Sequence, residues 1–164
     1  GGAMRQVLVY RHAKAEKSDG EIPDRQRRLL PRGQRQCESI GTELARRNRL
    51  PDAVITSPAV RARETAERTA ESVGYDGSVT EADVLYDATP RTFLSVLQDV
   101  SDEVTRVMIV GHNPSVEEFV EHATGRYRRM KTAHLAVLET DLASWRDIAP
   151  DTRFVVADYL EPEE

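Results

Sequence analysis

The sequence lacks the features that mark several classes of protein. It contains a single cysteine, Cys37, which excludes an intramolecular disulfide and is compatible with a reducing cytoplasm. No stretch approaches the ~20 consecutive apolar residues of a membrane span. No secretory leader precedes the first apolar run, and there is no internal repeat or low-complexity linker. We therefore expect a cytoplasmic protein without a membrane partner.

The balance of charge and the length of the chain limit its partners and its organisation. A formal net charge of -5 argues against a general nucleic-acid binder. A chain of 164 residues suits one domain with a substantial core, which we place at residues 4–160. Gly1-Gly2-Ala3 resembles an expression remnant, and residues 161–164 form an acidic tail. A monomer is favoured, although the sequence leaves the oligomeric state open.

Short apolar runs alternate along the chain with segments whose apolar residues recur at helical spacing. Buried strands are predicted at 7–10, 53–56 and 107–110, a weaker one at 79–85, and edge or antiparallel strands at 134–138 and 154–159. Helices are predicted over 33–48, from Pro90, and after Pro114; another begins with Ser57 as N-cap and Pro58 as its first residue and ends at Gly74. This order predicts an α/β fold, a three-layer α/β/α sandwich with a mostly parallel central sheet and helices on both faces.

Polar side chains follow three of the predicted strands. Arg11 and His12 follow the first, Arg61 lies just beyond the second, and His112 with Asn113 follows the third. Ligands bind beyond the carboxyl ends of parallel strands, where helix N-termini also stabilise anions. Without an obvious carboxylate or thiolate this set suits a phosphoryl group rather than a metal ion, so we expect no metal and no cofactor.

These residues also resemble a known family. The matching motifs are Arg11-His12-Ala13, Ser57-Pro58-Ala59-Val60-Arg61-Ala62 and Gly111-His112-Asn113-Pro114, which resemble the histidine phosphatase, or phosphoglycerate mutase-like, superfamily. The Arg-His-Ala-Lys form, the short chain and Leu85-Tyr86-Asp87-Ala88 are most similar to its SixA-type phosphohistidine phosphatase branch.

The resemblance implies a role for each site residue. His12 is the nucleophile that becomes a phosphohistidine, and Arg11, Arg61 and His112 bind the phosphoryl oxygens with help from Asn113. Asp87 matches the context of the family's general acid, with aspartate in place of glutamate. Asp19 and Asp24 are rivals for that role, and in the SixA branch the acid can be reduced or absent.

Three functions remain open. The leading one is a metal-independent phosphatase acting on protein phosphohistidine, because the short chain lacks the insertions that could close over a small substrate. A phosphatase or mutase of small phosphate esters is the alternative, and a phosphoprotein-binding module without turnover is a third. Two basic clusters are either solvated or form a rim that attracts an acidic partner or phosphoprotein; they are Arg25, Arg27, Arg28, Arg32, Arg35, and Arg126, Arg128, Arg129, Lys131.

Overall fold

One six-stranded sheet forms the centre of the molecule. The structure is a computed structural model and describes residues 3–163, so Gly1, Gly2 and Glu164 of the predicted remnant and tail lie outside the described residues. The strands run in the order β3-β2-β4-β1-β5-β6. Their bounds are β1 (Ala3–Arg11), β2 (Ala53–Thr56), β3 (Val79–Glu81), β4 (Arg106–Gly111), β5 (Leu135–Leu142) and β6 (Val155–Leu160).

Four of these strands are parallel and the last two are not. Neighbours pair in parallel from β3 to β1, whereas β5 pairs antiparallel with β1 and β6 with β5. The predicted mostly parallel sheet is confirmed, as is the antiparallel edge. Because β5 runs against β1, the chain enters β5 at the edge where β1, β2 and β4 end.

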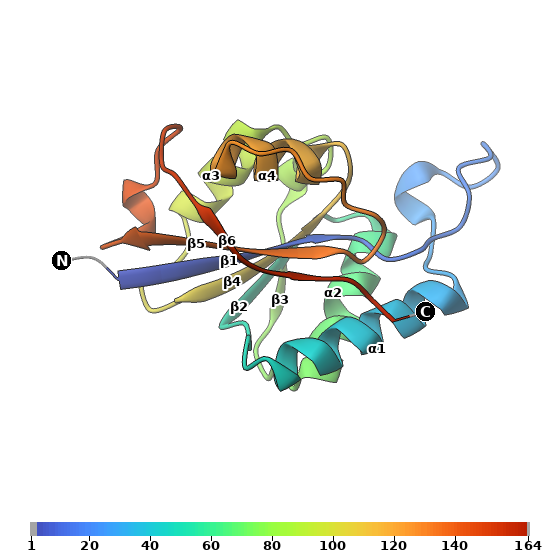
Figure 1. The fold of residues 1–164 in the computed structure, drawn as a ribbon. Helices are drawn as coiled ribbons and strands as arrows, with labels where there is room; N and C mark the ends of the chain where they lie inside the picture. Colours follow the sequence, from blue (N-terminus) through green and yellow to red (C-terminus); the bar gives the residue numbers. More distant parts are fainter. Residues whose placement is uncertain (1–2, 164) are drawn as a thin grey trace.

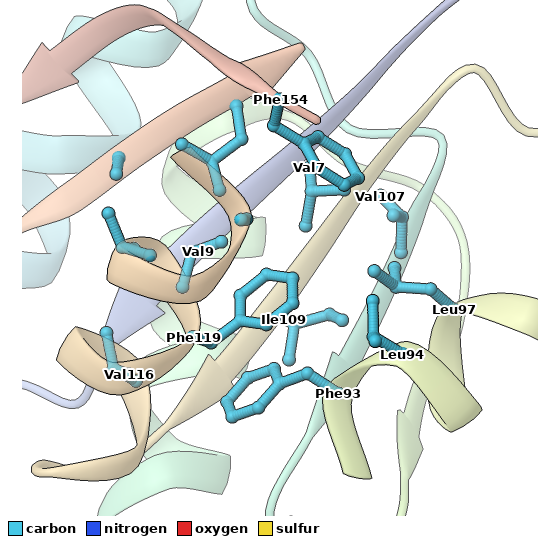
Figure 2. Close-up of a cluster of buried hydrophobic side chains, with 14 of the residues drawn as sticks. Val7, Val9, Phe93, Leu94, Leu97, Val107, Ile109, Val116, Phe119 and Phe154 are labelled. Carbon is cyan, nitrogen blue, oxygen red and sulfur yellow. The ribbon is translucent and has the colours of Figure 1, made fainter. Parts of the chain in front are cut away.

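Helices cover both faces of the sheet (Figure 1). Helices α1 (Pro31–Arg46) and α2 (Val60–Val73) lie on one face, and α3 (Pro90–Gln98) and α4 (Ser115–Thr124) lie on the other. Alternate residues of the strands supply the two cores, because successive side chains of a strand point to opposite faces. Val7 and Val9 pack with α3 and α4, around the stacked rings of Phe93 and Phe119 in Figure 2.

The second core contains the single thiol. Leu8 and Tyr10 of β1 pack with α1 and α2, where Cys37 is fully buried. Burial raises the pKa of the Cys37 thiol to about 11, which keeps it protonated and unreactive. Among residues 3–163, no helix is both long enough and apolar enough to cross a membrane.

Two predicted element boundaries are wrong. Helix α2 begins at Val60 with Ala59 in the N-cap position, so Ser57 does not cap it and Pro58 is not its first residue. The Ser57 hydroxyl instead accepts a hydrogen bond from the Ala59 amide, 3.3 Å away. The weak strand predicted at 79–85 ends at Glu81, and a 3-10 helix (Asp83–Leu85) follows it to bury Leu85.

Both described ends of the chain form contacts with the rest of the domain. Ala3 of the predicted remnant pairs with Leu142 at the start of β1. In the acidic tail, a Glu161 oxygen lies 3.7 Å from Nε2 of His134, and the Glu163 amide donates to Ser39. The domain limits at 4 and 160 stay a prediction.

Candidate active site

The carboxyl ends of β1 and β4 bring two histidines together. Arg11 and Gly111 pair at the ends of these strands, and His12 and His112 follow directly. The two imidazole rings lie 5.3 Å apart between centroids, tilted by 55°. Burial lowers the pKa of both histidines, and nearby Arg61 and Arg11 lower it further, so the four side chains share one electrostatic environment.

The hydrogen bond that His12 makes fixes its tautomer. Its Nδ1 lies 2.8 Å from the Ala13 carbonyl oxygen, which can only accept, so Nδ1 carries the hydrogen. The lone pair is therefore on Nε2. Burial lowers the pKa of His12 to about 3, and the side chain, only 8% exposed, is neutral at physiological pH. A neutral imidazole with a free Nε2 lone pair is the form that can attack phosphorus.

Hydrogen bonds within the protein hold one side of each of the three side chains around His12. Arg11 donates from Nη1 to the Met130 carbonyl at 3.0 Å. Arg61, 5% exposed, donates from Nη1 to the Asp24 carbonyl at 2.7 Å and from Nη2 to the Asp24 carboxylate at 3.0 Å. His112 Nε2 lies 2.7 Å from the Ser57 hydroxyl oxygen.

Each of these three side chains also has a buried nitrogen that lacks a hydrogen-bond partner within the described part of the protein. The Nε atoms of Arg11 and Arg61 and Nδ1 of His112 are buried and have no hydrogen-bond partner among residues 3–163. Buried donors without partners are costly and rare in proteins. A phosphoryl group has three peripheral oxygens that can accept hydrogen bonds, so an anion of this shape matches the three donors in number and charge.

Asn113 uses its amide to support the site. Its Nδ2 donates to the Met130 carbonyl at 2.9 Å, the same oxygen that accepts from Arg11. Asn113 thus helps to hold the carbonyl that orients Arg11. Its predicted contact with substrate stays a prediction.

The Asp24 carboxylate is ionised and forms an ion pair with Arg61. It also accepts from the Tyr86 hydroxyl and from Nε of Arg27. The hydrogen bond from Tyr86, together with those from Arg61 and Arg27, lowers the pKa of Asp24 to about 2. An ionised carboxylate cannot donate a proton at neutral pH, so Asp24 is a poor candidate for the general acid.

The other two carboxylates are exposed. Asp87 has a positive φ of 61° and follows Tyr86, whose ring lies edge-on to His112 at 5.6 Å between centroids. Asp19 accepts a hydrogen bond from the Glu21 amide in the loop after β1. The role of Asp87 as general acid stays a prediction. Within the described part of the chain, no group of three or more His, Cys, Asp or Glu side chains could hold a metal ion.

A family model agrees with this site. The model of the histidine phosphatase superfamily (branch 1) matches residues 7–89, about half of the chain, including His12 and Arg61. The chain belongs to the histidine phosphatase superfamily. This confirms the family predicted from the motifs and supports a phosphatase that acts through a histidine.

Relatives of this chain agree with it in sequence and in fold. An uncharacterised protein of Mycobacterium tuberculosis is 40% identical over 105 residues, which cover 64% of the chain and 63% of that protein. The match thus spans less than two thirds of that relative's length. The crystal structure of a candidate phosphohistidine phosphatase SixA from Agrobacterium tumefaciens superposes on this chain with a TM-score of 0.80. The two sequences are 28% identical, and the match covers 99% of each chain.

A further structure supports the fold alone. The protein histidine phosphatase SixA complexed with tungstate has a TM-score of 0.81 at 21% identity, over 96% of this chain and 97% of that one. The predicted likeness to SixA is therefore confirmed at the level of the fold.

Sequence reasoning missed two contributors to this site. The sequence predicts a helix cap at Ser57, whereas its hydroxyl binds His112 in the structure; a Ser-Pro pair that follows a strand fits both interpretations. The Met130 carbonyl, which binds Arg11 and Asn113, is a backbone group and leaves no signal in the sequence.

Ser57 is expected to set the tautomer of His112. Its oxygen accepts from the Ala59 amide, so its own hydrogen can go to Nε2 of His112, which leaves the imidazole hydrogen on the unpartnered Nδ1. We expect Ser57→Ala to lower kcat about tenfold, the value of one hydrogen bond. Ser57→Thr, which keeps the hydroxyl, is the matched control.

The imidazole nitrogen shifts in NMR spectra of the two variants test this assignment. Loss of the Nδ1-protonated form of His112 in Ser57→Ala, and its retention in Ser57→Thr, is the expected result. An unchanged tautomer in Ser57→Ala would leave Ser57 with a packing role only.

Proposed function

We propose that this protein is a phosphatase that transfers a phosphoryl group to Nε2 of His12 and then to water. The observation that supports this most is the set of unpartnered buried donors on Arg11, Arg61 and His112 beside a neutral His12. We further propose that the substrate is phosphohistidine on a protein. The name of the SixA relatives, phosphohistidine phosphatase, supports this choice of substrate.

The proposed reaction has two displacement steps. In the first, the Nε2 lone pair of His12 forms a bond to phosphorus while the bond from phosphorus to the substrate nitrogen breaks. The electron pair of that bond returns to the substrate imidazole, which leaves as a neutral ring when its other nitrogen carries a hydrogen. In the second step, water attacks the phosphohistidine, inorganic phosphate is released, and His12 regains its lone pair. Arg11, Arg61 and His112 hold the phosphoryl oxygens throughout.

The imidazole leaving group explains why the proposed reaction does not need a buried carboxylate as its general acid. An imidazole leaves more easily than an alkoxide, which must receive a proton as its bond to phosphorus breaks. Asp87 is exposed and lies next to Tyr86 rather than in a buried position. A site whose candidate general acid, Asp87, is exposed therefore favours phosphohistidine over an alkyl phosphate.

A comparison of two substrates with the Asp87→Asn variant tests the proposed function. We expect kcat/KM for a phosphohistidine peptide to change less than about threefold, whereas the residual activity on an alkyl phosphate falls about tenfold or more. Single-turnover quenching of the wild-type protein with radiolabelled peptide should trap a label that is stable in alkali and lost in acid.

Two outcomes contradict the proposal. Equal losses on both substrates would assign proton donation to Asp87 for phosphohistidine as well and favour small phosphate esters. Binding of the phosphohistidine peptide without any release of phosphate would identify a binding module instead of an enzyme.

A further inference from the structure

Residues 125–131, the first part of the connection between α4 and β5, present cations at the catalytic edge of the sheet. We call this segment the basic loop; its cations are Arg126, Arg128, Arg129 and Lys131, all exposed. None of them forms an ion pair with a carboxylate among residues 3–163. In Figure 1 this loop and the segment after β1 lie at the same end of the sheet. The loop thus concentrates positive charge on a protein whose net charge is negative.

The basic loop is tied directly to the catalytic residues. The Met130 carbonyl accepts from both Arg11 and Asn113, and the Met130 amide donates to the Glu117 carboxylate at 2.7 Å. The Met130 side chain is buried, at 1% exposure. Arg129 is close enough to Arg11 to lower the pKa of its guanidinium, after the larger effect of burial. A molecule bound on this loop would therefore lie against the rim of the phosphoryl pocket.

The conformation of the basic loop is fixed by contacts within the protein. The Arg128 guanidinium lies 3.4 Å from the centre of the Tyr159 ring, and the Tyr159 hydroxyl donates to the Arg129 carbonyl. The Tyr127 hydroxyl donates to Glu117 at 3.2 Å, while 59% of the residue stays exposed. Arginine and tyrosine are enriched where proteins bind one another, and a preformed surface loses little entropy on binding.

We propose that the basic loop docks an acidic protein surface that flanks the phosphohistidine of the substrate. This inference rests on the proposed function, because the loop adds recognition to the same pocket. Exposed cations that form no ion pair with a carboxylate among residues 3–163 attract external carboxylates, and the ordered backbone of the loop gives register as well as charge. A protein partner is favoured over a nucleic acid because the proposed substrate carries its phosphoryl group on a protein histidine, so the surface next to the pocket would meet a polypeptide.

Two phosphohistidine peptides of equal length test the proposed docking. One carries Asp and Glu on both sides of the phosphohistidine, and the other carries Asn and Gln at the same positions. Phosphoramidate, which is too small to reach the loop, measures the chemistry alone. We expect wild-type kcat/KM to be about tenfold higher for the acidic peptide, corresponding to about 1.4 kcal/mol, and we expect this preference to shrink at about 0.5 M salt.

Reversal of charges in the basic loop tests whether this loop causes the preference for the acidic peptide. The Arg126→Glu, Lys131→Glu double variant should lose the preference for the acidic peptide while its activity on phosphoramidate stays within about twofold. The matched control is Arg46→Glu, Arg146→Glu, which changes net charge equally. Arg46 ends α1, and Arg146 lies in the 3-10 helix Trp145–Asp147; both are exposed and lie away from the catalytic edge.

Each outcome supports or overturns one of the two proposals. Equal kcat/KM for both peptides, or equal losses in the loop and control variants, would overturn docking and leave the phosphatase intact. Tighter binding of a single-stranded oligonucleotide than of the acidic peptide would also overturn it, in favour of a nucleic-acid surface. No hydrolysis of either peptide or of phosphoramidate would overturn the proposed function itself.

Discussion

The His12→Ala variant is expected to lose turnover of every phosphoryl donor by a factor of at least about 10³. The reason is that no other described side chain combines a neutral imidazole with a free Nε2 lone pair and a position beside His112 at the carboxyl end of β1. Without the covalent intermediate, water must attack the substrate directly in a pocket arranged around Nε2. Release of phosphate from phosphoramidate and from a phosphohistidine peptide measures the loss.

The control for this prediction is another histidine of the same protein. His122 is exposed and binds the Pro150 carbonyl through Nε2, on the far end of α4 from the site. We expect His122→Ala to retain the activity and the acid-labile label of the wild type. An acid-labile label that persists in His12→Ala would place the nucleophile on another residue.

Arg61→Lys is expected to lower kcat/KM by about 10². Asp24 occupies the edge of the guanidinium formed by Nη1 and Nη2, which leaves Nε for the phosphoryl group. A lysine keeps the charge but has one nitrogen, so it cannot bind Asp24 on one side and an oxygen on the other with the same geometry. Steady-state kinetics on phosphoramidate, with inorganic phosphate as competitive inhibitor, measures both chemistry and anion binding.

A double-mutant cycle with Asp24→Ala separates positioning from charge. Asp24→Ala removes the contact from Nη2 and keeps the one from Nη1 to the Asp24 carbonyl, so Arg61 is held less firmly and we expect kcat to fall about tenfold. In the Arg61→Lys background the same change should cost little, because the bidentate contact is already lost. If Asp24 acts only by repelling the substrate, Asp24→Ala would instead raise kcat/KM in both backgrounds.

The fold could be predicted from the sequence because its signals are local. The apolar runs at 7–10, 53–56 and 107–110 are short, rich in branched residues and separated by helical stripes, so they indicate buried parallel strands. The position of Arg11, His12 and His112 at strand ends then follows from topology. The family resemblance supplied their chemical roles, which the residues alone left open.

The rest of the site depends on contacts between distant segments. Asp24 begins a 3-10 helix (Asp24–Gln26) within a stretch that the sequence marks only as polar, yet it reaches Arg61 and Tyr86, 37 and 62 positions further along the chain. The hydroxyl of Ser57 was assigned to a helix cap because local hydrogen bonds are the usual fate of a serine before proline. Neither contact has a periodicity or spacing that sequence reasoning could use.

The antiparallel direction of β5 has a consequence for how this scaffold can diversify. The residues assigned to chemistry follow β1, β2 and β4, whereas residues 125–131 enter the same edge from the opposite chain direction. Substitutions in that loop change what approaches the pocket, and they leave the parallel strands and their hydrogen-bond register untouched. The exposed cations of this loop can therefore be replaced during evolution without change to the strands, as long as the Met130 carbonyl keeps its hydrogen bonds to Arg11 and Asn113.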